Sequence, residues 1–553
     1  MNFLKNPDKL IYILLAVCVA FYIFGIWYGL PYFFVGDEQS LIGGALKMLQ
    51  LKNPFPVLQP QEFNLLYYPV LIPYVLNLFF IPVLLVFYFV GGFSGLNVFQ
   101  DYLILNSGAL IITARIVSVL FGLGLVFLIY QITKEIIKNS WASLLGATIF
   151  GLSFYQLQMS HFARHWIYTA FFAASILYCA IKIYFTREKK WYLLAGVTGG
   201  LSFGASYVGI LYLVFVFWAH FFTGAESWQE KIKSSNWWYF VLVFVGLSFL
   251  FFAIYPQAFL AVISGGGAPF GVKSLEGFLG AVLYMGKVLI FMDPVITALV
   301  VLGLIYFVRK RKNGYFLYPA LFLIVIYPAL LYFIFHEEPR YIFLLGPIFA
   351  ILAGEVIFWT LSQKNIVLKY GIVLVAIIFS LIINIRYDLL LTRSDTRILA
   401  KNWIEQNIPS GSSILVNFSQ LHIPQTKESI QNQKVLLLTS LRSYDQAYLN
   451  SDLKNQDPQY FVLNSRFLAG DQNALYNLKS WYAFDYLVFE RQKSDSLGDF
   501  ENQMLFDRLK VKGFYSSATL AEEDFTGNFI GGVWNFFKVQ NFGPEVNIYK
   551  TIR

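Results

Sequence analysis

The chain has 553 residues, of which 57% are hydrophobic and only 13% are charged. A soluble protein usually carries about 25% charged residues, so this composition excludes an ordinary soluble enzyme, and the mean hydropathy of +0.59 agrees. The net charge of +9 does not indicate nucleic-acid binding, because lysines and arginines at cytoplasmic loop ends account for it in a membrane protein.

Long apolar runs recur from residue 10 to residue 385. They predict a polytopic α-helical protein of the plasma (inner) membrane, with about 11 transmembrane helices. Placing the basic clusters between the spans on the cytoplasmic side gives a consistent alternation. The N-terminus is then cytoplasmic, and the residues after the last span lie outside.

Two adjacent acids, Asp37 and Glu38, follow the first apolar run in "FFVGDEQSLIGGALKML". Adjacent helical residues point about 100° apart, so one acid would face a pocket while the other caps the helix. We predict both as catalytic residues; an ordinary pair in the first turn of a helix stays an alternative. Glu62 ends the same outer loop, and Asp37 and Glu62 together could hold a divalent cation such as Mg, Mn or Zn.

The apolar run 64–91 contains Pro69, Pro73 and Pro82. Interior prolines break helices, so this run is predicted to be a juxtamembrane or re-entrant element with both ends outside. A single kinked span remains the alternative, and it would invert the topology of everything that follows.

The segment "MSHFARHWIY" lies where one span ends and the next begins. Arg164 is predicted to bind a phosphate, which is a natural partner for an arginine beside a membrane cavity. His161 and His165 share the spacing of one helical face, and His161 is a candidate third metal ligand. No HExxH motif is present, so a polar cap at the membrane interface is the competing interpretation.

Two further outer segments carry candidate phosphate ligands. The glycine-rich stretch 264–294 contains Lys273, and a flexible loop there could close over a substrate. Arg340 stands in "FHEEPRYIFLLGP", at the start of a later span. The alternative for Arg340 is an interfacial side chain that extends toward water.

After about residue 390 the composition becomes polar. A helix around Trp403 and Ile404 is expected to end at "PSG", and the strand "SILVNF" follows it. More strands are predicted at "KVLLLTS", "DYLVFE" and "EVNIYK". We therefore divide the chain into a membrane module, 1–389, and an extracytoplasmic α/β domain, 390–553.

Several stretches together resemble the GT-C glycosyltransferases, and within them the protein O-mannosyltransferase and aminoarabinose-transferase family. These are the acid pair with the following helix and "YYPVLIPY", "TARIVSVLFGLGLVFLIY", "HFARHWIYTAFFAASILY" and "EPRYIFLLGPIFAILAG". The helix "ILAKNWIEQNIPSGSSILV" and the end "NFGPEVNIYK" resemble the outer domains of bacterial members.

The resemblance implies inverting transfer of a hexose or pentose from a polyprenyl-phosphate donor, on the extracytoplasmic side of the bilayer, to a glycan, lipid or protein. By position, Asp37 matches the first-loop acid assigned as base or metal-linked residue, and Glu62 a later acid that can hold metal. Arg164 and Arg340 match basic residues near the lipid phosphate. The chain has Tyr67-Tyr68-Pro69 where many members have Lys-Pro-Pro.

Three other functions compete with this one. A transporter or flippase for lipid-linked sugars predicts internal repeats and broken helices at the bilayer midplane, and no repeat is evident. An oligosaccharyltransferase would carry a WWD signature, whereas "NWWYF" lacks the acid. An assembly protein that binds a partner through its outer domain is the third, and deleting that domain would separate it from an enzyme.

Overall fold

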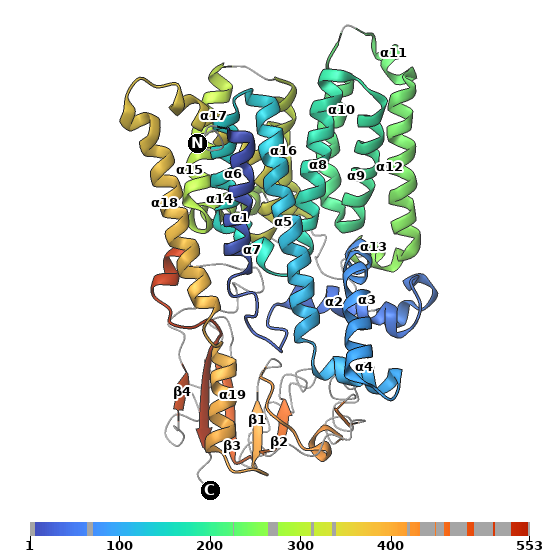
Figure 1. The fold of residues 1–553 in the computed structure, drawn as a ribbon, viewed down its shortest axis with the longest axis vertical. Coiled ribbons are helices and arrows are strands. Elements are labelled where there is room, and N and C mark those ends of the chain that lie inside the picture. Colours follow the sequence, from blue (N-terminus) through green and yellow to red (C-terminus); the bar gives the residue numbers. More distant parts are fainter. Residues whose placement is uncertain are drawn as a thin grey trace.

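The computed structural model describes most of the membrane module and the core of the C-terminal domain. The described residues are 6–63, 70–224, 226–263, 275–310, 314–334, 339–416, 421–431, 448–449, 458–464, 484–491, 512–514 and 532–550. Long helices form a bundle in the upper part of Figure 1, and a small sheet with one helix beside it lies below their lower ends. The predicted fold class, a polytopic helical protein with a C-terminal α/β domain, is confirmed.

The first half of the bundle runs from α1 to α10. Their bounds are α1 (Pro7–Ile23), α2 (Gly36–Gln50), α3 (Leu71–Gly91), α4 (Leu96–Leu105), α5 (Gly108–Ile137), α6 (Ser140–Gly151), α7 (Phe154–His161), α8 (His165–Thr186), α9 (Lys189–Ala205) and α10 (Leu213–Phe221), with 3-10 turns η2 (Pro56–Leu58), η3 (Pro60–Phe63) and η4 (Tyr207–Tyr212).

The second half completes the bundle and leads into the C-terminal domain. Its helices are α11 (Trp228–Lys233), α12 (Ser235–Ile254), α13 (Pro256–Ile263), α14 (Leu275–Met292), α15 (Pro294–Lys310), α16 (Gly314–Ile334), η5 (Pro339–Leu345), α17 (Gly346–Leu361), α18 (Ile366–Leu391) and α19 (Thr396–Asn407).

Helix starts follow ordinary capping chemistry. The side chains of Asn6, Asn139, Ser153, Asn365 and Asp395 each accept a hydrogen bond from a backbone N–H in the first turn of the helix that follows. These bonds satisfy donors that a helix N-terminus otherwise leaves unpaired, which matters most where water is scarce.

Six helical segments among the described residues have the length and apolar composition that a membrane crossing requires. They are Leu71–Gly91, Gly108–Ile137, His165–Thr186, Ser235–Ile254, Arg340–Leu361 and Ile366–Asn407. Shorter apolar helices cover Ser140–Gly151, Tyr207–Phe221, Pro294–Arg309 and Phe316–Leu331. The predicted number of 11 crossings stays a prediction.

Helix α3 is long enough to cross a membrane, but the helices before and after it in the chain lie at the same end of the bundle. Helices α2 and α4, which precede and follow it, both lie at the end of the bundle that faces the sheet (Figure 1). The first half of α3 is buried against the bundle, and its second half, from Leu84 onward, is not buried. Whether this run is a juxtamembrane element with both ends outside or a single crossing stays a prediction.

The C-terminal domain is built on a five-stranded sheet with the order β2-β1-β3-β5-β4. Strands β1, β2 and β3 are parallel, and β5 runs antiparallel to β3 and β4. The strands are β1 (Ser413–Val416), β2 (Phe461–Asn464), β3 (Tyr486–Arg491), β4 (Lys512–Phe514) and β5 (Glu545–Lys550). Helix α19 covers the sheet with Ala400 and Ile404.

Three of the predicted strands are confirmed. "SILVNF" contains β1, "DYLVFE" covers all of β3 except its last residue, and "EVNIYK" is β5, whereas "KVLLLTS" lies outside the described residues. Strands β2 and β4 were missed, and the three residues of β4 give too little pattern to detect.

The C-terminal domain returns to the bundle before its last strand. Its 3-10 turn η8 (Val533–Phe537) places Phe536 in the core of the bundle, 5.1 Å between ring centres from Phe154 and 5.3 Å from Tyr387. Arg386 of α18 donates to the carbonyls of Phe536 and Val539. The two parts of the chain therefore share one packed interface.

Candidate active site

Glu38 lies in the first turn of α2 and is completely buried. Its two carboxylate oxygens accept hydrogen bonds from Nε and Nη2 of Arg115 in α5, each at 2.8 Å. The remaining guanidinium nitrogen of Arg115, Nη1, donates to the carbonyls of Ile26 and Tyr28. A buried charge pair is stable only when its other polar atoms are also bonded, and this pair meets that condition.

The same carboxylate reaches the turn between α7 and α8. Glu38 Oε1 accepts a hydrogen bond from the backbone N–H of Ala163 at 2.9 Å. The next residue, Arg164, is buried and stands directly before the first residue of α8. The predicted acid and the predicted phosphate-binding arginine therefore belong to one structural unit, although about 125 residues separate them.

Asp37 occupies the residue before Glu38, also in the first turn of α2. The structure places its backbone and does not describe its side chain. Both Asp37 and Glu38 remain predicted catalytic residues, but only Glu38 has a described environment, in which each oxygen already has a partner.

Arg340 stands at the start of η5, with its guanidinium carbon 5.6 Å from the centre of the Tyr341 ring. Tyr341 in turn packs against Trp166 of α8, with 4.8 Å between ring centres. Trp166 is two residues after Arg164, so these ring contacts join the two segments that carry the predicted phosphate-binding arginines. Lys273, the third predicted ligand, lies outside the described residues.

The predicted metal ligands do not form a cluster among the described residues. Glu62 makes an exposed ion pair with Lys47 of α2, at 2.9 Å between nitrogen and oxygen. His161 is buried, and burial together with the charge of Arg115 lowers the pKa of its ring to about 3. No group of three metal-binding side chains is found in the described part of the chain, which does not include the side chain of Asp37, so the divalent cation stays a prediction.

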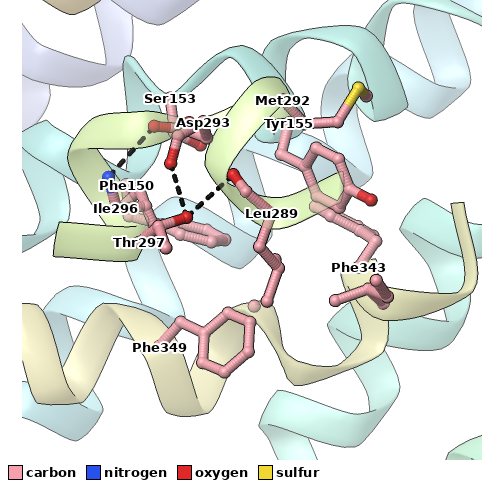
Figure 2. Close-up of a pocket in the computed structure, with 12 residues that line it drawn as sticks. Phe150, Ser153, Tyr155, Leu289, Met292, Asp293, Ile296, Thr297, Phe343 and Phe349 are labelled. Atoms are coloured by element: carbon pink, nitrogen blue, oxygen red, sulfur yellow. Dashed lines mark hydrogen bonds between the residues drawn. The ribbon is translucent and has the colours of Figure 1, made fainter. Parts of the chain in front are cut away.

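A small, mostly apolar pocket lies between the start of α7, η5 and the junction of α14 and α15 (Figure 2). Ser153 and Tyr155 reach it from the start of α7, Phe343 from η5, and Asp293 from the junction of α14 and α15. Asp293 Oδ1 accepts a hydrogen bond from the N–H of Ile296 at 3.1 Å and so caps α15. Burial raises the pKa of Asp293, which lies outside both helices, to about 6.

Comparison with known families gives a match over the part of the chain that carries Arg164. Residues 60–263 match the family model described as dolichyl-phosphate-mannose-protein mannosyltransferase. The resemblance predicted from the sequence is confirmed. No curated protein that was compared with the chain matches it.

Two solved structures of ArnT from Cupriavidus metallidurans are similar to the chain. The apo structure has 12% sequence identity and a TM-score of 0.47, and the match covers 91% of this chain and 96% of that one. The structure bound to undecaprenyl phosphate has 11% identity and a TM-score of 0.45, with 97% of each chain covered.

The mannosyltransferase match spans α3 through α13. It includes Arg115, the turn at Ala163 and Arg164, and Glu62 near its start. Glu38, Arg340 and the C-terminal domain lie outside it, so their association with this family region comes from the contacts described above.

Sequence reasoning did not single out Arg115. A signal was present, because an arginine inside the apolar run "TARIVSVLFGL" has to find a buried partner. The partner, Glu38, could not be identified, since the two residues are 77 positions apart. Asp293 was missed for a different reason, because one acid before a proline is the ordinary signature of a helix start.

Proposed function

We propose that the protein is an integral-membrane inverting glycosyltransferase, which moves a sugar from a polyprenyl-phosphate carrier to an extracytoplasmic glycan, lipid or protein. One observation carries the proposal: the buried Glu38–Arg115 pair fixes the α2 turn that holds Asp37 beside the backbone that holds Arg164. The family match over residues 60–263 supports the reaction class and a lipid-phosphate donor.

The proposed reaction needs one base and several positively charged side chains. In this proposal the acceptor hydroxyl attacks the anomeric carbon of the sugar, and its proton passes to the carboxylate of Asp37. The bond between the anomeric carbon and the phosphate oxygen breaks, and its electron pair leaves with the polyprenyl phosphate. Arg164 and Arg340, joined by Lys273 from the glycine-rich loop, stabilise the charge that develops on the phosphate.

Asp37 and Glu38 take different roles in this scheme. Every oxygen of Glu38 is bonded to Arg115 or to the N–H of Ala163. A base has to be able to receive a proton and to reach the reacting hydroxyl, which a carboxylate held on both oxygens does poorly. Asp37 is therefore the proposed base, and Glu38 holds the turn on which Asp37 stands.

No step of the proposed mechanism uses a metal. Glu62 would have to leave Lys47 before it could bind a cation. The predicted divalent cation has a separate test: turnover that EDTA abolishes and Mn²⁺ restores would support it. Turnover that is unchanged after chelation would remove the cation from the account.

The experiment uses purified protein in nanodiscs, a panel of polyprenyl-phosphate sugars and a cell-envelope extract as acceptor. Release of polyprenyl phosphate is followed for the wild type and for Asp37→Asn. Release by the wild type that the variant reduces about 100-fold or more, the range expected on loss of a general base, supports the proposal. Equal release by both proteins would contradict the role of Asp37, and binding of no donor would contradict the reaction class.

A further inference from the structure

A second buried carboxylate lies where the membrane module meets the C-terminal domain. Asp395 caps α19, and its oxygens accept hydrogen bonds from Nε and Nη2 of Arg397 at 2.8 and 2.9 Å. The hydroxyl of Tyr28, in the turns after α1, donates to Asp395 Oδ2. All three side chains are at most 3% exposed, so water does not compete for these bonds.

Tyr28 connects this cluster to the candidate active site. Its carbonyl oxygen accepts a hydrogen bond from Arg115 Nη1 at 2.8 Å, and Arg115 is the partner of Glu38. A path of buried contacts therefore runs from Asp395 through Tyr28, Arg115 and Glu38 to the N–H of Ala163, and Tyr28 takes part in it with its hydroxyl at one end and its backbone carbonyl at the other. In a low-dielectric surrounding, such networks hold their members in one arrangement.

Two further residues of the C-terminal domain contact the segment just before α2. The guanidinium carbon of Arg397 lies 3.9 Å from the centre of the Phe34 ring. Phe34 stands two residues before the start of α2 and three before Asp37. The imidazole of His422 also stacks on Tyr32 of the same segment, with ring centres 4.2 Å apart and planes 11° from parallel.

We propose that Asp395 and Arg397 are positioning residues for the reaction, which act through Tyr28, Arg115 and Glu38 to hold the turns that carry Asp37 and Arg164. The C-terminal domain is then part of the catalytic apparatus, although none of these residues of the domain touches the reacting atoms. This inference rests on the proposed function for its effect on turnover, and on the contacts alone for its effect on structure.

The structural part is tested by hydrogen exchange, without donor or acceptor. Tyr28→Phe removes the donor of the contact between the domains, and Asp395→Asn removes the negative charge of its acceptor. Both should speed amide exchange in a peptide covering residues 159–165 by about tenfold, the change that 1.4 kcal/mol of lost protection gives. Unchanged exchange in that peptide in both variants would overturn the proposal, whatever reaction the protein catalyses.

The matched control is Arg386→Gln. Arg386 of α18 also joins the two parts of the chain, because its Nε and Nη2 donate to the carbonyls of Phe536 and Val539, and these bonds do not include Asp395, Tyr28 or Glu38. Exchange at residues 159–165 should stay as in the wild type. Faster exchange in this control as well would mean that any loosening of the interface has the same effect. It would overturn the proposal that the coupling runs through Asp395, Tyr28 and Arg115.

The kinetic part measures turnover and donor affinity in nanodiscs. Small displacements of reacting groups cost about 100-fold in rate, so Tyr28→Phe and Asp395→Asn should lower kcat about 10-fold to 100-fold and change the donor Kd much less. The double variant should be no slower than the slower single variant, because the bond that Tyr28→Phe removes is one of those that Asp395→Asn weakens. A kcat of the double variant that falls by the product of the two single effects would contradict the proposed coupling. A change confined to the donor Kd would contradict it too. If no variant or wild-type protein turns over, the proposed function fails, while the exchange result still decides the coupling.

Discussion

Glu38 and Arg115 form a charge pair that water does not reach, since both side chains are at most 1% exposed. Replacing Glu38 with Gln leaves the guanidinium buried without a counter-ion, and breaking such a pair costs about 3–5 kcal/mol. We expect Glu38→Gln to lower the Tm of the detergent-purified protein clearly. Glu62→Gln is the control, because its pair with Lys47 is exposed and such pairs contribute about 0–1 kcal/mol. Equal Tm values for the two variants would contradict this assignment.

Arg340 is proposed to contact the donor phosphate. Charge-assisted hydrogen bonds contribute about 1.5–3 kcal/mol, so Arg340→Gln should weaken the binding of polyprenyl phosphate about 10-fold to 100-fold. Arg309→Gln, at the far end of α15, serves as control and should leave binding unchanged. Calorimetric titration in nanodiscs measures both, and an unchanged affinity in Arg340→Gln would remove this arginine from the phosphate site.

Helix α15 begins at a buried acid, Asp293, and the stability of the protein should therefore depend on pH through this residue. Because the pKa of Asp293 is raised to about 6, the folded protein holds this proton more tightly than the unfolded chain. The contribution to stability is therefore complete below the unfolded pKa of about 3.9 and is lost as the pH rises through about 6. Asn is an equally good helix cap, so Asp293→Asn should lack this loss. Parallel Tm profiles for the two proteins between about pH 4 and 6 would contradict the raised pKa.

The position of α3 gives a prediction about topology. If both of its ends face outside, Asn53→Cys and Ser94→Cys should both react with a membrane-impermeant maleimide in right-side-out vesicles. The native Cys18 and Cys179 are buried, and Lys190→Cys, at a predicted cytoplasmic end, should not react. A single crossing by α3 would place Asn53 and Ser94 on opposite sides, so that only one of them reacts.

At the scale of the whole molecule, apolar runs and the change to a polar composition after about residue 390 were enough to predict the helical bundle and the α/β domain after it. Hydrophobic periodicity reports on a local stretch of chain, and for that reason it located the helices. It could not report that Glu38 bonds Arg115, that Tyr28 bonds Asp395, or that Phe536 returns to the bundle core, because each contact joins residues far apart in sequence.

For the candidate site, the sequence predicted individual residues but not the contacts between them. Asp37, Arg164 and Arg340 were chosen because charged residues beside a membrane segment are energetically costly and usually have a functional role. The structure adds the contacts that join their segments, Glu38 to Ala163 and Trp166 to Tyr341. The long buried path to the C-terminal domain had no counterpart in the local sequence.

The central claim is that sugar leaves its lipid carrier in a reaction that needs Asp37. The most direct measurement places the protein in proteoliposomes with a polyprenyl-phosphate donor labelled in the sugar, adds envelope acceptor outside, and follows the label. The account predicts that label moves from lipid to acceptor, with one polyprenyl phosphate released per sugar, and that Asp37→Asn abolishes the transfer. Label that stays on the lipid while the lipid changes leaflet would contradict the account and identify a flippase.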